Sequence, residues 1–200
     1  MPHAIRPSFL RSVSGVSQKD KPRLYVALYS RRSGHGDCDA YHWALVVGPD
    51  AASRTDLTHR FHLDHSRSAG IRKDSMCGSL FSEEELDGSS QADLLCLIAI
   101  AKVLDLERLS EVLREQRPRS STGEASTGCL QWVQDAFAAA HMDGKCLKSY
   151  FKGDEWADIE RCAREYCRAK RRDGRFTDNG TWAKDSVSTY NFWERRETRT

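Results

Sequence analysis

The chain has 200 residues, of which 39% are hydrophobic and 30% are charged, and this length and composition suit one domain with a core of ordinary size. No apolar run approaches the roughly 20 residues that a membrane-spanning helix requires, and residues 1–20 lack a stretch typical of a secretion signal, so a soluble cytoplasmic protein is expected. The formal net charge of +2 is small, and a basic surface would have to come from local clustering.

The first half of the chain predicts an antiparallel sheet. Residues 1–20 are Ser-rich and aperiodic, which predicts a flexible arm. Residues 23–30 and 41–48 are rich in strand-forming side chains and are separated by a polar loop, which predicts a wide hairpin, and a shorter third strand follows over residues 58–64. Residues 93–102 are apolar almost throughout, so periodicity does not distinguish a buried strand from a buried helix. A central strand is favoured because a separate helix is predicted immediately after it.

The second half predicts three helices. Asp105 is a suitable N-cap for the first, which carries leucines at helical spacing. A polar loop over residues 117–128 precedes the second helix, which is predicted to begin near Thr127 or Gly128 and to end at Asp143-Gly144. The third helix is predicted from Asp154 to about Arg172.

The order of these elements predicts an α+β domain with an antiparallel sheet packed against helices. We expect a flexible N-terminal arm over residues 1–20 and a single α+β catalytic domain over residues 21–176. Aromatic side chains in residues 177–200 predict a C-terminal tail that packs partly on this domain.

Seven cysteines occur, at positions 38, 77, 96, 129, 146, 162 and 167. Their number is odd and no two of them form a Cys-x-x-Cys pair, so reduced thiols are expected rather than a disulfide or zinc framework. No metal and no organic cofactor is predicted, and each thiol has to be judged by its surroundings.

Cys129 is the strongest candidate nucleophile. It follows Gly128 at the predicted start of a helix, where unpaired backbone N–H groups and the helix dipole favour a thiolate and can bind a developing oxyanion. The alternative is a small buried cysteine that begins an apolar stripe. Cys38 ranks second, because the neighbouring Asp37 and Asp39 disfavour a negative charge on its sulfur.

His42 is the candidate base, because it stands at the head of a predicted strand where a sheet can hold its ring rigidly. The alternative is a structural histidine of the core. His62, on the next strand, could orient His42, contact a substrate carbonyl or face solvent. Three acidic residues are alternative orienting groups: Asp37, Asp39 and Asp64. The neighbours of the two key residues are the candidate substrate-binding residues: Tyr41, Trp43, Gly128 and Trp132.

The order of these residues resembles that of the circularly permuted papain-like enzymes, the NlpC/P60-related group that includes lecithin:retinol acyltransferase-like and PPPDE-type proteins. The corresponding segments are Tyr41-His-Trp-Ala-Leu-Val-Val47, Arg60-Phe-His62 and Gly128-Cys-Leu-Gln-Trp-Val133, with Gly128 where the group often has Asn. The resemblance implies a permuted papain-like fold in which His42 is the base, His62 orients it, and Cys129 forms an acyl thioester.

Longer phrases that begin at Arg23, Tyr41 and Cys129 look like those of an uncharacterised fungal family of similar length. Some small fungal natural-product enzymes, the arginine-containing cyclodipeptide synthases, join aminoacyl groups from tRNA. A relationship to them would imply that Cys129 accepts an aminoacyl group and that a second amine attacks the thioester.

Basic residues cluster on the last predicted helix, and the cluster is either a solvated face or a footprint for tRNA phosphates. Its members are Arg161, Arg164, Arg168, Lys170, Arg171 and Arg172. Three functions are therefore predicted as alternatives: an acyltransferase that uses an acyl or aminoacyl donor, a cysteine peptidase or amidase that uses water, and a non-enzymatic module that binds RNA or a protein through the basic helix. No membrane partner is expected.

Overall fold

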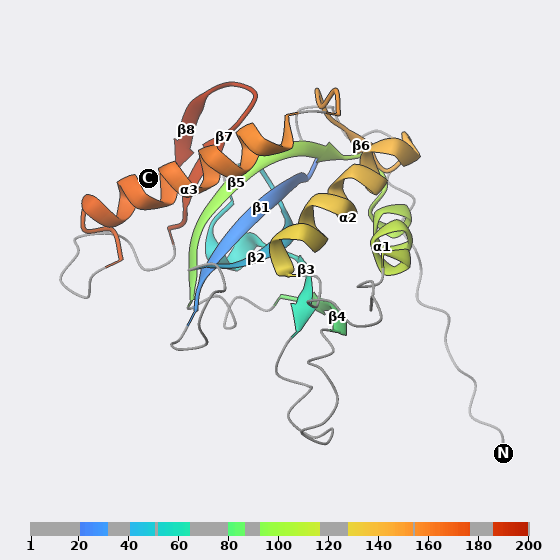
Figure 1. Cartoon of the computed structure of the whole chain (residues 1–200), viewed down its shortest axis with the longest axis horizontal. Coiled ribbons are helices and arrows are strands. Elements are labelled where there is room, and N and C mark those ends of the chain that lie inside the picture. The colour runs from blue at the N-terminus through green and yellow to red at the C-terminus, as the bar shows by residue number, and fades with distance from the viewer. Residues whose placement is uncertain are drawn as a thin grey trace, which may run out of the picture.

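A computed structural model describes residues 21–31, 41–50, 52–64, 80–86, 93–116, 128–153, 155–176 and 186–199. Within these ranges the chain forms one eight-stranded, mostly antiparallel sheet and three α-helices (Figure 1). The predicted α+β class with an antiparallel sheet is therefore confirmed. No helix in the described ranges combines the length and the apolar character needed to cross a membrane.

The strands are β1 (Arg23–Ser30), β2 (Tyr41–Gly48), β3 (His59–Asp64), β4 (Leu80–Glu85), β5 (Leu94–Val103), β6 (Leu147–Lys148), β7 (Ser188–Asn191) and β8 (Arg196–Arg199). The helices are α1 (Leu106–Glu115), α2 (Cys129–Asp143) and α3 (Trp156–Arg172), with a 3-10 turn at Arg54–Asp56. The strand order is β4-β3-β2-β1-β5-β7-β8, and β6 pairs with the end of β5. Only the pairing of β5 with β7 is parallel among the described strands.

The apolar segment after residue 92 is the central strand β5, as predicted. It pairs with β1 on one side and with β7 on the other, and every residue of it except Lys102 is buried. A strand covered on both faces has no polar side to show, which explains why its sequence lacks the alternation of a half-exposed strand.

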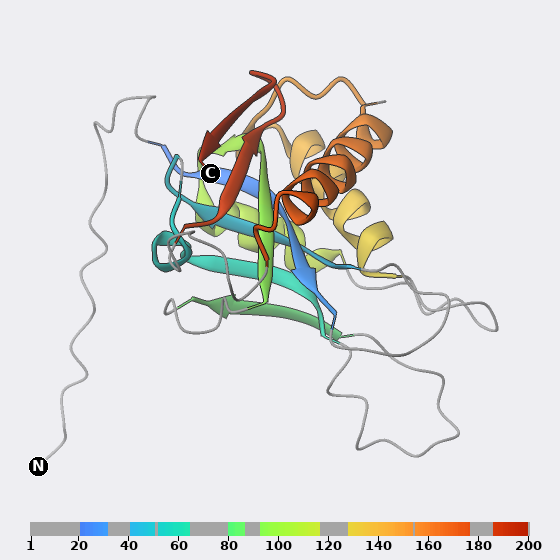
Figure 2. The same ribbon diagram turned by 90° about the vertical axis from the view of Figure 1, so that its left-hand side faces the viewer.

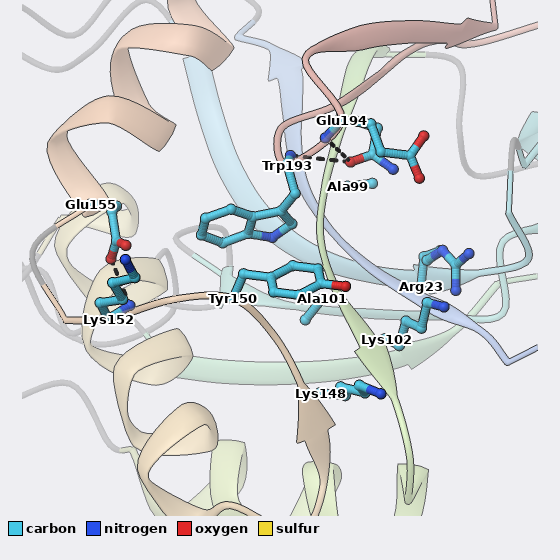
Figure 3. Close-up of a pocket in the computed structure, with 11 residues that line it drawn as sticks. Arg23, Ala99, Ala101, Lys102, Lys148, Tyr150, Lys152, Glu155, Trp193 and Glu194 are labelled. Atoms are coloured by element: carbon cyan, nitrogen blue, oxygen red, sulfur yellow. Dashed lines mark hydrogen bonds between the residues drawn. The ribbon is translucent and has the colours of Figure 1, made fainter. Parts of the chain in front are cut away.

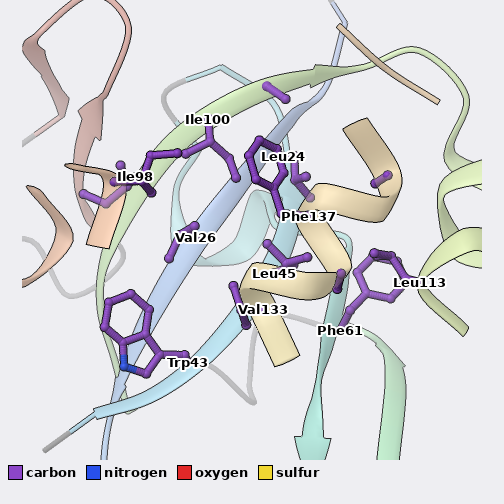
Figure 4. Packing of buried hydrophobic residues seen from close by; sticks show 14 of the residues in the cluster. Leu24, Val26, Trp43, Leu45, Phe61, Ile98, Ile100, Leu113, Val133 and Phe137 are labelled. Carbon is purple, nitrogen blue, oxygen red and sulfur yellow. The ribbon is translucent and has the colours of Figure 1, made fainter. Parts of the chain in front are cut away.

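Helices α2 and α3 cover one face of the sheet (Figure 2). Side chains of alternate strand residues, such as Trp43 and Leu45, pack there against Val133 and Phe137 of α2 (Figure 4). The residue between them, Ala44, belongs to a smaller core cluster on the other face. The sheet therefore separates two apolar layers, and neighbouring residues on β2 face different layers.

The start of α2 fixes the position of the candidate nucleophile. Gly128 is the N-cap in an extended conformation with φ −67° and ψ 158°, so Cys129 is the first residue of the helix, as predicted. Gly144 ends the helix with φ 69°, a left-handed conformation that glycine adopts without steric cost. Helix α1 begins as predicted, with the Asp105 side chain accepting a hydrogen bond from the N–H of Arg108 at 2.9 Å.

Four strands were not predicted from the sequence: β4, β6, β7 and β8. Residues 186–199 supply β7 and β8, so this part of the C-terminal segment belongs to the sheet itself. The predicted arm over residues 1–20 lies outside the described residues, as does most of the polar loop before Gly128.

Candidate active site

Cys129 lies at the junction of α2 with the sheet and is 3% exposed. Its Sγ accepts a hydrogen bond from the backbone N–H of Trp43 at 3.5 Å and lies 3.6 Å from Nη2 of Arg31. Both groups are donors of the kind that stabilises a negatively charged sulfur. The ring of Trp43 is covered by the guanidinium of Arg164, 5.1 Å from its centre, which pairs with Glu160.

The contact with Trp43 depends on where β2 and β3 begin to pair. Their ladder starts at Ala44 opposite His62 and runs to Val47 opposite His59. The preceding residue, Trp43, therefore directs its N–H past the end of the ladder, where Sγ accepts it. The thiol thus lies at the point where the two histidine-bearing strands separate.

His42 and His62, the predicted base and a candidate for its orienting group, lie side by side. Nε2 of His42 is 3.1 Å from Nδ1 of His62, and the two rings meet edge to face at 86°. Nε2 of His62 is in turn 2.9 Å from Oε1 of Glu84 on β4. The three side chains form a line of two hydrogen bonds across three adjacent strands.

Burial lowers the pKa of His62, and the hydrogen bond to Glu84 offsets only part of this effect. Burial alone would raise the pKa of Glu84, but the hydrogen bonds from His62 and Arg60 outweigh it and lower that pKa below its usual value. A neutral His62 beside a carboxylate donates from Nε2 and accepts at Nδ1. His42 must then donate from Nε2, which makes Nδ1 of His42 the ring nitrogen that can take a proton.

Arg60 holds the far side of Glu84. Its Nε donates to Oε2 of Glu84 at 3.1 Å, and Nη2 contacts the same oxygen. The Arg60 guanidinium also lies 5.2 Å from the centre of the Tyr29 ring, which is itself next to His42. Burial raises the pKa of Tyr29 to about 12, so its phenol stays neutral. The histidine line is therefore fixed by charged and aromatic neighbours on its own face of the sheet.

The structure does not bring the thiol and the imidazole into direct contact. The two groups that Sγ contacts belong to Trp43 and Arg31, and not to His42. Because side chains alternate along β2, His42 shares the sheet face of Ala44, whereas Cys129 belongs to the cluster on the helix-covered face. Cys129 contacts the peptide bond that joins His42 to Trp43.

The predicted substrate-binding residues are mostly in the core. Trp132 is 2% exposed, packs against Phe81, and donates its indole N–H to the carbonyl of Gln116 at 2.7 Å. Tyr41 and Trp43 are also buried, whereas Gly128 is exposed at the helix start. Of these four predictions, only Gly128 has a surface on which a substrate could lie without rearrangement.

The predicted nucleic-acid-binding residues on α3 separate into two groups. Arg164 and Arg171 turn toward the sheet, where they lie over the rings of Trp43 and Tyr41. Lys170 is buried and pairs with Glu197 of β8 at 2.6 Å.

The remaining three, Arg161, Arg168 and Arg172, line a groove of about 1070 Å³ between α3 and β7–β8. Aromatic residues, Tyr190 and Phe192 among them, line the same groove. Three acids, Glu155, Asp158 and Glu165, also line the groove, and Asp158 pairs with Arg161, so the rim around the aromatic side chains carries charges of both signs.

The other described cysteines are free and differ from Cys129 in their surroundings. Burial raises the pKa of Cys146 to about 12 and that of Cys162 to about 11. A hydrogen bond with Cys167, together with burial, raises the pKa of Cys96 well above its usual value. These three thiols are therefore poor nucleophiles at neutral pH. A hydrogen bond with Cys96 lowers the pKa of Cys167, but that side chain is enclosed in the core. Three predicted alternatives lie outside the described residues: Cys38, Asp37 and Asp39.

Two residues of the site were missed at the level of sequence, Arg31 and Glu84. Glu84 was missed because β4 was not predicted: its sequence has two apolar residues followed by Ser82 and three glutamates, with no alternation that would signal a strand. Asp64, an alternative orienting group, ends β3, but the carboxylate that accepts from His62 is that of Glu84. Within the described part of the chain, no group of three His, Cys, Asp or Glu residues is arranged to hold a metal ion.

A family model described as "Family of unknown function (DUF6914)" matches residues 21–199, which is almost the whole chain. No curated protein and no solved structure shows a significant match.

Proposed function

We propose, from the geometry of its site, that this chain is a cysteine-dependent acyl-transfer enzyme. The chain belongs to the DUF6914 family, whose function is unknown. The observation that carries the proposal is the line from Glu84 through His62 to His42, which ends one residue away from the peptide N–H that contacts Cys129. Thiol catalysis requires an oriented base that can reach the thiol. Here Cys129 contacts the peptide bond that follows His42, so the two side chains have to come together when a donor binds.

In the proposed reaction, Cys129 gives its proton to Nδ1 of His42, and the thiolate forms a C–S bond with the acyl carbon of the donor. The leaving group takes the proton from His42 as its bond to the acyl carbon breaks. An amine or water then gives a proton to His42 and attacks the thioester. The C–S bond breaks, the acyl product leaves, and His42 returns the proton to the sulfur of Cys129. Sγ must exchange its contact with Trp43 for one with His42 when a donor binds, because catalytic hydrogen bonds often form only in the complex.

Glu84 and Arg60 have supporting roles in this reaction. The carboxylate fixes the tautomer of His62, which fixes that of His42, and Arg60 holds the carboxylate in place. The N–H groups of the first turn of α2 are available for the oxyanion of the tetrahedral intermediate. This set of roles supports a permuted papain-like arrangement, in which the base precedes the nucleophile in the chain.

The burst of p-nitrophenol from p-nitrophenyl acetate tests the proposal without knowledge of the natural donor. We expect about one equivalent of p-nitrophenol per chain, an acetyl group on Cys129 that hydroxylamine removes, and no burst from Cys129→Ala. His42→Gln should slow the burst by about 10²- to 10⁴-fold, the usual contribution of a general base.

Cys162→Ala is the matched control, because Cys162 is the described cysteine with a partly exposed side chain outside this site. It should leave the burst unchanged. Retention of the burst by a folded Cys129→Ala protein, or acetylation of Cys162 at the same rate as Cys129, would refute the proposal. The chemistry of the thioester is the same for an acyltransferase and for a cysteine peptidase or amidase, and the partition between amine and water acceptors distinguishes them.

A second candidate function is RNA binding, either of an aminoacyl-tRNA that serves as the donor, as in cyclodipeptide synthesis, or of RNA alone. Arg168 and Arg172 supply positive charge in the groove beside α3, which is about 1070 Å³, whereas Arg161 is paired there with Asp158. Binding of tRNA that weakens steeply between 50 and 200 mM salt, and that is lost when the three arginines are changed to Glu, would support a tRNA-dependent reaction. The RNA-binding module without catalysis would show this binding but no burst.

A further inference from the structure

The two ends of strand β1 carry arginines with different partners. Arg23 begins the strand and lines a cavity of about 640 Å³ (Figure 3), and its guanidinium pairs with Asp50 at 2.7 Å. Arg31 directly follows the strand, is half-buried, and has Nη2 3.6 Å from Sγ of Cys129. In the part of the chain that the structure describes, no carboxylate pairs with Arg31. The guanidinium of Arg31 therefore belongs to the surroundings of the thiol.

Other groups around the sulfur add to this positive potential. Cys129 is the first residue of α2, whose N-cap Gly128 has no capping side chain and whose first turn contains no acidic residue. The positive end of the helix dipole is therefore not offset by a side chain of the helix. Glu160, which lies near the ring of Trp43 through its ion pair with Arg164, is already neutralised by that arginine.

Acylation of Cys129 would change the charge that Arg31 faces, and this step rests on the proposed function. Before acylation, a thiolate at Sγ can neutralise the guanidinium. In the thioester the sulfur carries no charge and is a weak hydrogen-bond acceptor. A carboxylate on the acyl chain would restore the lost counter-charge. It also suits the fork of N–H donors that a guanidinium presents.

The space beside the thiol suits a polar acyl chain better than an apolar one. Trp43 and Trp132 are buried in the core and offer no open apolar pocket at the sulfur. Gly128 is exposed, and a Cβ added there would meet no atom of the described residues within 4 Å. The surfaces that remain next to Sγ are thus the backbone at Gly128 and the guanidinium of Arg31.

We propose that the acyl donor carries a carboxylate on its acyl chain and that Arg31 binds this carboxylate. Arg31 is then the residue that determines which acyl group is transferred. A donor of this class is the activated monoacyl form of a dicarboxylic acid, such as a succinyl group.

Alkylation of Cys129 by iodoacetate and by iodoacetamide tests the proposal. Both reagents form a C–S bond with the same thiolate and release iodide, so the ratio of their rates does not depend on how readily the sulfur loses its proton. Only iodoacetate carries a carboxylate for Arg31. Peptide mass spectrometry should show a ratio of iodoacetate to iodoacetamide rates about tenfold higher at Cys129 than for N-acetylcysteine, the effect of one charge-assisted hydrogen bond.

Variants of Arg31 identify the source of this preference. Arg31→Gln should return the ratio at Cys129 to about the value for N-acetylcysteine, and Arg31→Lys should keep a raised ratio because it keeps the charge. Arg196→Gln is the matched control: it removes the same charge from an exposed arginine of β8 and should keep the wild-type ratio.

Ester substrates extend the test to acyl transfer. Cys129 should be acylated about tenfold faster by mono-p-nitrophenyl succinate, after subtraction of its hydrolysis in buffer, than by p-nitrophenyl butyrate, whose acyl chain has as many carbons. Arg31→Gln should abolish this preference.

A wild-type alkylation ratio equal to that of N-acetylcysteine, a ratio unchanged in Arg31→Gln, or no alkylation of Cys129 by iodoacetate would overturn the proposal. A p-nitrophenol burst without preference for the succinyl ester would also refute it, while the proposed acyl transfer would stand. A raised alkylation ratio without any burst would refute acyl transfer and leave only an anion site at the thiol.

Discussion

His62 connects the two other members of the histidine line, because each of its ring nitrogens has one partner. Nδ1 lies 3.1 Å from His42 and Nε2 lies 2.9 Å from Glu84. A charged imidazole would have no lone pair to accept the hydrogen bond of His42. Its neutral form is therefore a condition of the proposed mechanism, and burial favours that form.

The same burial predicts how stability depends on pH. Burial lowers the pKa of folded His62 below its usual value of 6.5, so just below pH 6.5 the unfolded chain binds a proton that the folded chain does not. The stabilisation is present above pH 6.5 and is lost as the pH falls toward the lower folded pKa. The urea midpoint should therefore drop less between pH 7.0 and 5.5 in His62→Gln than in the wild type.

Glu84 does not affect the comparison of urea midpoints between pH 7.0 and 5.5. Its pKa is lowered from 4.5, so its contribution to the free energy of unfolding is lost only at more acidic pH. His59→Gln, on the same strand but with its ring beside the hydroxyl of Thr58, is the control and should follow the wild type. Equal pH dependence in wild type and His62→Gln would contradict the assignment of a neutral, buried His62.

At the level of elements, the strands and helices whose buried side chains recur at regular spacing could be predicted from the sequence. Strands β1, β2 and β3 and all three described helices begin within two residues of their predicted starts. Strand β4 was not predicted, because it is an edge strand that ends in three consecutive glutamates. Charges on an edge strand discourage pairing with other chains, and they also hide the strand from pattern recognition.

The residues of the candidate site also separate into those that short sequence motifs reveal and those that only the structure reveals. The order of His42, His62 and Cys129 could be read from short motifs, and the two histidines do meet. Glu84 could not be recognised without β4, and Arg31 reaches Cys129 across 98 positions of sequence. The burial of Trp132 was also missed, because an apolar helix stripe reads the same whether it faces a ligand or the core.

Gly48, at the end of β2, tests the packing of the smaller core cluster. A Cβ there would lie 2.8 Å from Cδ2 of Leu57 and 3.3 Å from Cβ of Ala52. Leu57 is fully buried, so its side chain has little room to move away. Gly48→Ala should lower the free energy of unfolding by about 1–2 kcal/mol in urea titrations, the usual cost of overpacking.

A double-mutant cycle supplies the control for Gly48. In a Leu57→Ala background the contact with Cδ2 is absent, so adding Gly48→Ala should cost markedly less than it does in the wild type. The same penalty in both backgrounds would place the strain in the backbone and not in the contact with Leu57.

At the scale of the whole molecule, the C-terminal hairpin of β7 and β8 connects the sheet to helix α3. Strand β7 pairs in parallel with β5, and Trp193, beside the turn of the hairpin, lines the groove next to α3. The hairpin also contacts α3, whose Arg164 lies over Trp43 near the thiol. A change that loosens the hairpin should therefore affect the global stability of the domain.

Glu197 of β8 is the main polar contact between the hairpin and α3. It accepts the hydroxyl of Tyr166 at 2.5 Å and pairs with Lys170, which is 8% exposed, at 2.6 Å. Glu197→Gln leaves the ammonium of Lys170 buried without its counter-charge, which is costly. Because the Glu197 side chain itself is 31% exposed, water reduces the effect, and we expect a loss of about 1–2 kcal/mol in the free energy of unfolding.

Glu194→Gln, on the same hairpin, is the matched control. Its ion pair with Arg196 is exposed, with side chains 49% and 65% accessible, and such pairs contribute less than about 1 kcal/mol. Urea unfolding of both variants, followed by tryptophan fluorescence, should therefore show a clear difference in midpoint. If Glu197→Gln and Glu194→Gln unfold at the same midpoint, the hairpin is held to α3 by its apolar contacts, such as the packing of Tyr190 on Tyr166, and not by the buried charge pair.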